Sequence, residues 1–536
     1  MKITFYPSKI TGVVPKGVTI LEAARMLGVS IEGPCGGAGR CGRDLVQIRK
    51  EGVLHTVLAC KTPAKTDLEV ILPSHEKKAL KIVEGFYLKD GRVCDIDPFV
   101  RKELMHNEHG LYFTNVYVND DLLFAENGDT KDRTYGIAID IGTTTLVASL
   151  VDLNSGAVLN SSSTLNPLVY YGNDVMSRIK YSASQENGLL RMHRELISAV
   201  NLLIQVLSSE KAVRPENIYQ IVGAGNTTMQ HIFLNKEIKR IGEYPYQAET
   251  LDICTATAWE LSLDIASKAP VTTFPCISAY VGGDIVSGLL AVDMKSVEMP
   301  ALFLDIGTNG EIALILNDRI VASSTAAGPC FEGMTISSGM RAGTGAIEHV
   351  RFDDRLYLDV IGGGQPKGIC GSGLLDLVSE LVRIGLINSS GRLQAPDNKN
   401  NLFVRDGKRF FRLADNVSIS QEDIRQVQLA KAAIRAGVEV LLAGCNVKAG
   451  EIRTVVIAGG FGYHLNEKSL FGTGLLPELP NAKLSFAGNS SLEGAAKVLL
   501  NQKLVSDALR IARTAQVVEL SQTPDFESVF IREMRF

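Results

Sequence analysis

The chain has 536 residues, of which 45% are hydrophobic and 21% are charged, so it is long enough for roughly two to four globular domains. Its formal net charge is −4 and its sequence contains no run of five like charges, which excludes the basic footprint of a nucleic-acid-binding protein. No apolar stretch approaches the roughly 18 residues of a membrane-spanning helix, and the N-terminus carries no apolar signal core. We therefore expect a cytoplasmic protein with neither a nucleic-acid nor a membrane partner.

Residues 1–75 alternate short apolar runs with one helical pattern. Strands are predicted at 3–7, 17–20, 45–50 and 68–73, and LEAARMLG at 21–28 predicts a helix that ends at Gly28. Together these elements predict a compact α+β unit. Residues 76–133 are polar and irregular, with an Asp90-Gly91 turn signal, and predict a linker or small connecting element.

From residue 134 to 536 the pattern of apolar strands, glycine turns and longer helices predicts one large α/β domain. Two of its segments, at 138–151 and 303–316, share an apolar strand, Asp-Ile-Gly-Thr, a polar turn and a second strand. Such an internal repeat predicts a duplicated architecture. A capping box at Ser420 and Asp423 predicts a helix over 421–443, and VVIAGGFG at 455–462 predicts a strand that runs into a glycine turn.

The two repeated turns are candidate phosphate sites, because successive backbone N–H groups in a tight turn form a nest for anions and small residues let a phosphate approach closely. The first turn contains Gly142, Thr143, Thr144 and Thr145, and the second contains Gly307, Thr308, Asn309 and Gly310. Two such turns could hold a polyphosphate from opposite sides. The later glycines Gly459, Gly460 and Gly462 could admit an adenosine group against bare backbone.

A carboxylate lies at the end of the strand before each turn. Asp140 and Asp305 are natural holders of a hydrated Mg²⁺, which needs only one or two carboxylates. Asp284, Asn226 and Thr227 are further candidates for lining the cleft, and a buried structural role is the alternative for each. Asp140, Asp284 and Asp305 are thus the candidate catalytic residues.

The three glycine motifs, in this order, resemble those of the acetate and sugar kinase, Hsp70 and actin superfamily. The resemblance covers about three quarters of the chain. It implies a two-lobed, actin-like ATPase domain with ATP and Mg²⁺ in the cleft between the lobes.

The segment GPCGGAGRCGRD, followed by LAC, suggests an iron–sulfur site. Cys35, Cys41 and Cys60 stand close to the spacing of plant-type 2Fe–2S clusters, in which a glycine-rich loop carries three cysteines and a fourth lies further on. Asp44 stands where the third cysteine belongs, and its hard oxygen suits iron–sulfur chemistry less well than thiolate. A degenerate domain without a cluster is the alternative, and Cys94 could replace the missing ligand only if the linker folded back.

Throughout its length, the chain resembles the reductive activators of corrinoid proteins. The segments that carry this resemblance include NPLVYYGNDVMSRI, GAGNTTMQH, YVGGDIVSG and GICGSGLLD. The family resemblance implies a 2Fe–2S domain of β-grasp, ferredoxin-like fold, a linker and an actin-like ATPase domain. It also implies a low-potential electron donor, a homodimer, and a corrinoid protein whose cobalt is returned from Co(II) to Co(I) at the expense of ATP.

Three other functions stay open on the sequence alone. In a small-molecule kinase, Asp284 would deprotonate a substrate hydroxyl and the N-terminal unit would be vestigial. In a nucleotide-gated, chaperone-like binding module, ATP turnover would not drive electron flow. An activator of 2-hydroxyacyl-CoA dehydratases would share the ATPase core, but the ferredoxin-like N-terminus disfavours it.

Overall fold

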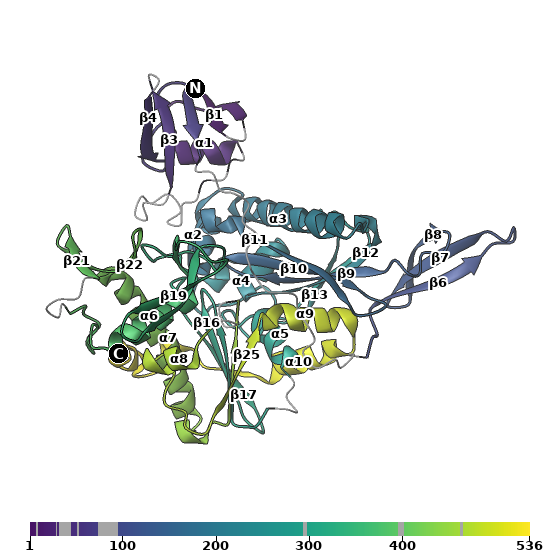
Figure 1. Ribbon diagram of the computed structural model, residues 1–536. Coiled ribbons are helices and arrows are strands. Elements are labelled where there is room, and N and C mark those ends of the chain that lie inside the picture. The colour runs from purple at the N-terminus through teal and green to yellow at the C-terminus, as the bar shows by residue number, and fades with distance from the viewer. Residues whose placement is uncertain are drawn as a thin grey trace.

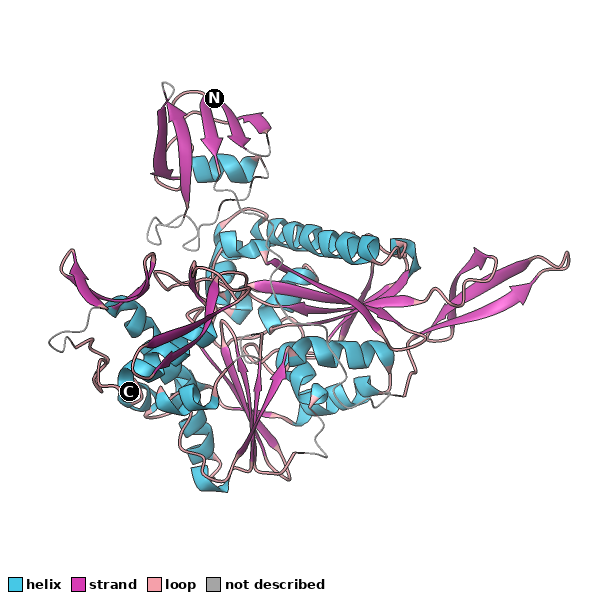
Figure 2. Ribbon diagram, in the orientation of Figure 1, coloured by secondary structure: helices cyan, strands magenta, loops and turns pink. Residues whose placement is uncertain are grey.

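The fold is taken from a computed structural model, which describes residues 1–6, 9–27, 29, 31, 44–50, 53–72, 95–292, 297–394, 401–460 and 465–536. Figures 1 and 2 show a small N-terminal unit, a projecting β-sheet and a large two-sheet body. Within the described residues, no helix combines the length and the apolar character required to cross a bilayer.

The N-terminal unit is a five-stranded sheet with one helix. Its strand order is β2-β1-β5-β3-β4, with β1 and β5 parallel and the other pairs antiparallel. The strands are β1 (Lys2–Tyr6), β2 (Ile10–Val13), β3 (Leu45–Lys50), β4 (Val53–Leu58) and β5 (Leu68–Ile71). Helix α1 (Ile20–Met26) begins with a capping box and buries its apolar face against the sheet.

The strand predicted at 17–20 is wrong. Gly17 is a turn residue with φ of +91°, and the side chain of Thr19 caps α1 by accepting a hydrogen bond from the backbone N–H of Glu22. The apolar residues Val18 and Ile20 therefore belong to a turn and a helix start. The predicted helix is confirmed up to Met26, whereas Gly28 lies outside the described residues.

Part of the stretch that was expected to be irregular is an ordered antiparallel sheet. Strands β6 (Val100–His106), β7 (Tyr112–Val118) and β8 (Asp121–Asn127) pair in that order, and Figure 1 shows them projecting from the body. Buried Val116 and Val118 of β7 alternate with more exposed neighbours, so the polar composition had hidden a half-buried strand. The Asp90-Gly91 turn signal lies outside the described residues.

The body contains two six-stranded sheets that confirm the predicted duplication. Their orders are β11-β10-β9-β12-β14-β13 and β25-β24-β15-β16-β17-β26. From β9 and from β15, two antiparallel pairings follow on one side and two parallel pairings on the other. The outermost strands differ, because β13 pairs antiparallel with β14 and β26 pairs parallel with β17. The first sheet contains β9 (Tyr135–Ile141), β10 (Thr145–Asp152), β11 (Val158–Leu165), β12 (Ile218–Ala224), β13 (Cys254–Thr257) and β14 (Pro270–Thr273). The second contains β15 (Ala301–Ile306), β16 (Gly310–Ile315), β17 (Ile320–Thr325), β24 (Thr454–Ala458), β25 (Lys483–Gly488) and β26 (Gln516–Val517).

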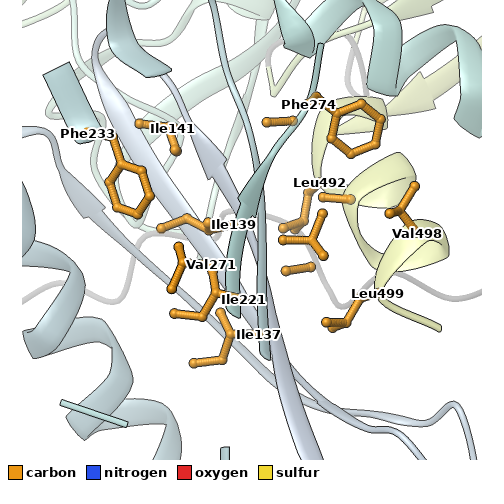
Figure 3. Packing of buried hydrophobic residues seen from close by; sticks show 14 of the residues in the cluster. Ile137, Ile139, Ile141, Ile221, Phe233, Val271, Phe274, Leu492, Val498 and Leu499 are labelled. Carbon is orange, nitrogen blue, oxygen red and sulfur yellow. The ribbon is translucent and has the colours of Figure 1, made fainter. Parts of the chain in front are cut away.

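Helices cover both faces of the first sheet and connect it to the second. Figure 1 shows α3 on one side of β9 and β10 and α9 on the other. In Figure 3, Phe233 of α4 and Leu492 of α9 pack near the isoleucines of β9. Each fully buried aliphatic side chain contributes roughly 1.5–3 kcal/mol to stability. The helices are α2 (Val175–Ser184), α3 (Gly188–Glu210), α4 (Thr227–Phe233), α5 (Gly283–Ala291), α9 (Ser490–Leu500) and α10 (Leu504–Thr514).

The second sheet carries the remaining elements. The predicted helix at 421–443 is confirmed as α7 (Gln421–Gly444), whose capping box joins Ser420 and Asp423 and whose side chains pack on β16 and β17. Two small sheets and three more helices surround it. They are β18 (Ala346–Phe352), β19 (Leu356–Val360), β20 (Gly368–Ile369), β21 (Leu402–Arg405), β22 (Lys408–Ala414), β23 (Val417–Ser420), α6 (Gly371–Arg383), α8 (Glu467–Gly472) and α11 (Phe526–Arg532).

Candidate nucleotide site and redox domain

One cavity collects residues from both repeats. The predicted site residues that line it are Asp140, Gly142, Thr143, Thr144, Thr145, Asp284, Asp305, Gly307, Thr308, Asn309, Gly459 and Gly460. Gly462 lies outside the described residues. The structure therefore brings the two candidate phosphate turns and the first two glycines of the third motif together, although they are far apart in sequence.

Gly310 does not line this cavity, and the structure gives it a different task. A Cβ atom at Gly310 would lie 2.8 Å from Cγ1 of Ile434 and 3.0 Å from Oγ1 of Thr325. The residue therefore allows α7 to pack closely against β16, and its part in phosphate binding stays a prediction. Thr227, a further candidate for lining the cleft, is also buried away from it and donates to the Ser278 carbonyl at 2.7 Å.

The first turn is held from behind through its backbone carbonyls. The side chain of Asn166 donates to the Gly142 carbonyl at 2.7 Å, and its backbone N–H donates to the Thr144 carbonyl at 2.9 Å. Nη2 of Arg178 donates to the Thr143 carbonyl at 2.5 Å. These three bonds fix the orientation of the peptide units that line the cavity. Neither Asn166 nor Arg178 was identified from the sequence, although both lie in the family-like segment at 166–179.

The second turn contacts the first directly. Oγ1 of Thr308 lies 2.8 Å from Oγ1 of Thr144, and both hydroxyls are buried. Oγ1 of Thr308 also donates to the carboxylate of Glu332, at 3.0 and 3.1 Å from its two oxygens. Gly459, at φ of +96°, lets β24 end against this turn, because a Cβ atom there would lie 2.7 Å from Oδ1 of Asp305.

Five carboxyl groups line the cavity: Glu311 is buried, and Asp140, Asp284, Asp305 and Glu332 are half-buried. Burial raises the pKa of Asp140 to about 6 and that of Asp284 to about 7. Burial, with the charges of neighbouring acids, raises the pKa values of Asp305 and Glu311 well above the ordinary range. A site that concentrates this much potential negative charge is suited to a cation.

The sequence analysis missed Glu311. In the repeat it occupies the position of Leu146, so a charged residue stands in a strand position that is apolar in the first copy. It is 5% exposed. A charged residue is rarely buried unless it has a partner or a function, so an acid within an apolar strand indicates a functional site. Comparing the two repeats position by position would have identified Glu311.

Residues from distant segments orient Asp140 and the first turn. The Asn489 side chain and the Ser491 hydroxyl, at the start of α9, donate to the two oxygens of Asp140 at 2.8 and 3.0 Å. Asn226 caps α4 and donates to Oγ1 of Thr143 at 2.8 Å. Asn226 lines the cavity, as predicted. Asn489 and Ser491 also line it, but they come from a segment without a recognisable motif.

The cavity residues fit a hydrated Mg²⁺ better than a directly caged metal. Among the described residues, no three His, Cys, Asp or Glu side chains are close enough together to hold a metal ion by themselves. Mg²⁺ commonly keeps several waters and uses one or two carboxylates plus phosphate oxygens. The strand-end carboxylates Asp140 and Asp305 match that pattern.

In the N-terminal unit, Asp44 and Cys60 lie next to each other. Asp44 is 1% exposed, and its Oδ2 accepts a hydrogen bond from the backbone N–H of Cys60. Its Oδ1 is buried and has no hydrogen-bond partner within the described part of the chain. A buried, unpartnered carboxylate oxygen is costly, so this atom fits a place beside a bound group. Cys35, Cys41 and Cys94 lie outside the described residues.

Two protein-family models match the body of the chain. Residues 135–297 match the RACo middle region, and residues 299–536 match the C-terminal domain of RACo, described as its ASKHA domain. The chain belongs to the RACo family. A solved relative of this RACo-family chain, described as a reductive activator for corrinoid, iron–sulfur protein, is 32% identical with a TM-score of 0.78, and the match covers 100% of this chain and 98% of that one.

Two curated relatives of this RACo-family protein match over most of their length. The corrinoid activation enzyme RamQ of Eubacterium limosum is 30% identical, over 96% of this chain and 96% of its own. The Co(II) methylated amine-specific corrinoid protein reductase of Methanosarcina barkeri is 24% identical, over 75% of this chain and 77% of its own. The names of both relatives refer to corrinoid proteins, as does the description of the solved relative.

Proposed function

We propose that this RACo-family protein is an ATP-dependent reductive activator that returns the cobalt of a separate corrinoid protein from Co(II) to Co(I). The observation that carries the proposal is the full-length match to a reductive activator, which includes the N-terminal unit as well as the body. An ATPase that only transferred phosphate would have no need for that unit. We place the domain boundaries at 1–75, 76–133 and 134–536, with action in the cytoplasm, as a homodimer.

The nucleotide site follows from the two turns. The residues of the first turn and Gly307, Thr308 and Asn309 of the second face one cavity, so they would hold the phosphates of ATP from both lobes. Gly460 would leave room for adenosine, since no heavy atom of the described residues lies within 4 Å of a Cβ atom built there. Asp140 and Asp305 would hold hydrated Mg²⁺, which when bound neutralises phosphate charge during transfer to water.

Asp284 would orient the attacking water. It is the second residue of helix α5, directly after Gly282 and Gly283. A Cβ atom on Gly282 would lie 2.4 Å from Cα of Asn226, so the glycine allows this close crossing. With its pKa raised to about 7, Asp284 can both accept and return a proton near neutral pH. ATP plus water then gives ADP and phosphate.

The N-terminal unit is proposed to be a ferredoxin-like domain that passes single electrons from a low-potential donor. Cys35, Cys41 and Cys60 would hold a 2Fe–2S cluster, which when bound supplies one electron to Co(II). Asp44 would complete the ligand set through Oδ1, the buried oxygen without a partner in the described chain. An oxygen ligand binds iron–sulfur clusters less well than thiolate, so we expect a cluster of reduced affinity.

ATP is needed because the reduction of Co(II) is unfavourable. Each ~59 mV of unfavourable one-electron potential costs a factor of ten in the equilibrium. A nucleotide can shift this equilibrium only if it favours one conformation of the activator and its partner. The cavity lies between two sheets that the nucleotide would contact together, so its occupancy can bias how the lobes sit against each other.

The proposal is tested by which partner stimulates ATP turnover. Purified protein is assayed for phosphate release alone, with a corrinoid protein held as Co(II), and with a panel of sugars and carboxylates. We expect stimulation by the Co(II) corrinoid protein and no phosphorylated small molecule. A phosphorylated sugar or carboxylate would instead support a kinase. A rate of phosphate release that no partner changes would support a nucleotide-gated binding module.

A further inference from the structure

Arg178 of α2 is a fully buried cation behind the first phosphate turn. Its side chain is 0% exposed and is among the largest fully buried side chains of the protein. Nε donates to the Gly172 carbonyl at 3.1 Å, Nη1 lies 2.8 Å from Sδ of Met229, and Nη2 donates to the Thr143 carbonyl at 2.5 Å. All three partners are neutral.

The charge of Arg178 has no ion-pair partner in the described part of the chain. The nearest acids in its surroundings are Asp174 and Glu332, but Asp174 caps α2 by accepting from the N–H and hydroxyl of Ser177, and Glu332 accepts from Thr308. Burial lowers the pKa of Arg178 to about 9, which still leaves the guanidinium protonated at neutral pH. Asp174 and Glu332 stabilise the cation from a distance, but neither makes an ion pair with it. A buried cation without a direct partner is destabilising, and a further anion close to it would offset that cost.

We propose that Arg178 is a positioning residue of the nucleotide site, whose missing counter-charge is the polyphosphate of the bound nucleotide. This inference rests on the proposed function. The guanidinium acts through Thr143, because a charged donor on that carbonyl polarises the peptide and makes its N–H, which belongs to Thr144, a stronger donor to phosphate. Its charge also attracts the phosphates across the turn.

The rival role for Arg178 is purely structural. Its bonds to Gly172 and Thr143 tie α2 to the turn, and a loose turn would weaken the binding of every nucleotide by a similar factor. A charge role differs, since its effect must grow with the number of phosphates in the ligand. A ladder of AMP, ADP and ATP therefore separates the two.

The experiment measures the dissociation constants of AMP, ADP and ATP by calorimetry on the full-length protein, with thermal melting as a check of folding. Arg178→Met removes the charge, and Arg178→Lys keeps it. Lys180→Met removes the same charge from an exposed position on the same helix and is the matched control. We expect Arg178→Met to weaken ATP binding about tenfold or more, ADP less and AMP least. Arg178→Lys should retain most of the preference for ATP, and Lys180→Met should change nothing.

Equal losses for the three nucleotides, or no loss in Arg178→Met, would overturn the inference. If Arg178→Met does not fold, Arg178→Gln decides, because its amide can still donate to the Thr143 carbonyl while the charge is gone. The same graded loss is then expected. A parent protein that binds none of the three nucleotides would refute the proposed nucleotide site itself, which is a different result from an ungraded loss in the variants.

Discussion

Oγ1 of Thr144 and Oγ1 of Thr308 are hydrogen-bonded at 2.8 Å although the residues are 164 positions apart in the chain. Each belongs to the turn of one repeat, so this bond joins the two candidate phosphate turns. Thr308 continues the contact to Glu332. A ligand that enters between the turns must therefore meet a preformed contact between the two lobes.

Thr308→Val is expected to impair ATP turnover while keeping the fold. Valine has nearly the same shape but cannot bond to Thr144 or Glu332, so we expect a loss of about 1 kcal/mol in the free energy of unfolding and at least a tenfold loss of phosphate release. Thr325→Val is the control, because the buried hydroxyl of Thr325 has no partner among the described residues. It should be neutral or slightly stabilising. Equal effects of the two substitutions would contradict the role given to Thr308.

Glu311→Gln should raise the stability of the protein and lower its ATP turnover. The carboxyl is buried beside Asp284 and Asp305, and removal of a buried like charge is expected to raise the melting temperature of the nucleotide-free protein. ATP turnover should fall at least tenfold, since the site loses negative charge that organises the cation and water. The exposed Glu527→Gln on α11 serves as the control. A variant with normal turnover and an unchanged melting temperature would show that Glu311 is an ordinary buried residue.

The pair formed by His349 and Asp376 predicts a pH-dependent contribution to stability. Nδ1 of His349 lies 3.0 Å from Oδ2 of buried Asp376, and this hydrogen bond raises the pKa of His349. A histidine whose pKa is higher in the folded state stabilises the protein below about pH 6.5, and that stabilisation is lost as the pH rises through the folded pKa.

The measurement is the free energy of denaturant unfolding of His349→Gln and of the parent protein at about pH 5.5 and about pH 8. The difference between them should be larger at the lower pH. The exposed His55→Gln should show no such change. Asp376 lies on α6, whose first residues Gly371 and Ser372 line the nucleotide cavity, so nucleotide affinity is a second readout. A difference that does not vary with pH would refute the pair's contribution.

Asp44→Cys should strengthen the iron–sulfur site. The substitution restores the third thiolate of the plant-type pattern beside Cys60, so we expect tighter cluster retention after anaerobic reconstitution and a sharper 2Fe–2S absorption and EPR signature than in the parent protein. Asp67→Cys, at an exposed position of the same unit, controls for an added thiol. If neither the parent nor Asp44→Cys holds a cluster, the redox assignment is wrong.

Much of the candidate nucleotide site could be predicted because its residues lie in short, repeated motifs. The Asp-Ile-Gly-Thr turns follow apolar strands, and strand ends with glycine turns carry a clear local signal. Asn489, Ser491 and Arg178 could not be found in this way, because their role depends on where α9 and α2 cross the turns. Such contacts follow from tertiary packing, which no local pattern encodes.

The departures from expectation have local causes as well. Residues 17–20 alternate like a strand, but the turn at Gly17 and the cap at Thr19 take precedence. Gly310 shares its turn with the phosphate motif, yet it is required by the approach of Ile434. A glycine in a motif therefore indicates that another group approaches the backbone closely. The three-dimensional structure is needed to tell whether that group is a ligand or a packed helix.

The central claim is tested most directly by the yield of Co(I). Reduced, cluster-loaded protein is mixed anaerobically with a Co(II) corrinoid protein, with Mg-ATP, with Mg-ADP or without nucleotide, and Co(I) is followed by absorption. The account predicts substantial Co(I) only with ATP, and loss of that yield in Thr308→Val but not in Thr325→Val. Equal Co(I) without ATP, or none in its presence, would contradict an ATP-dependent reductive activator.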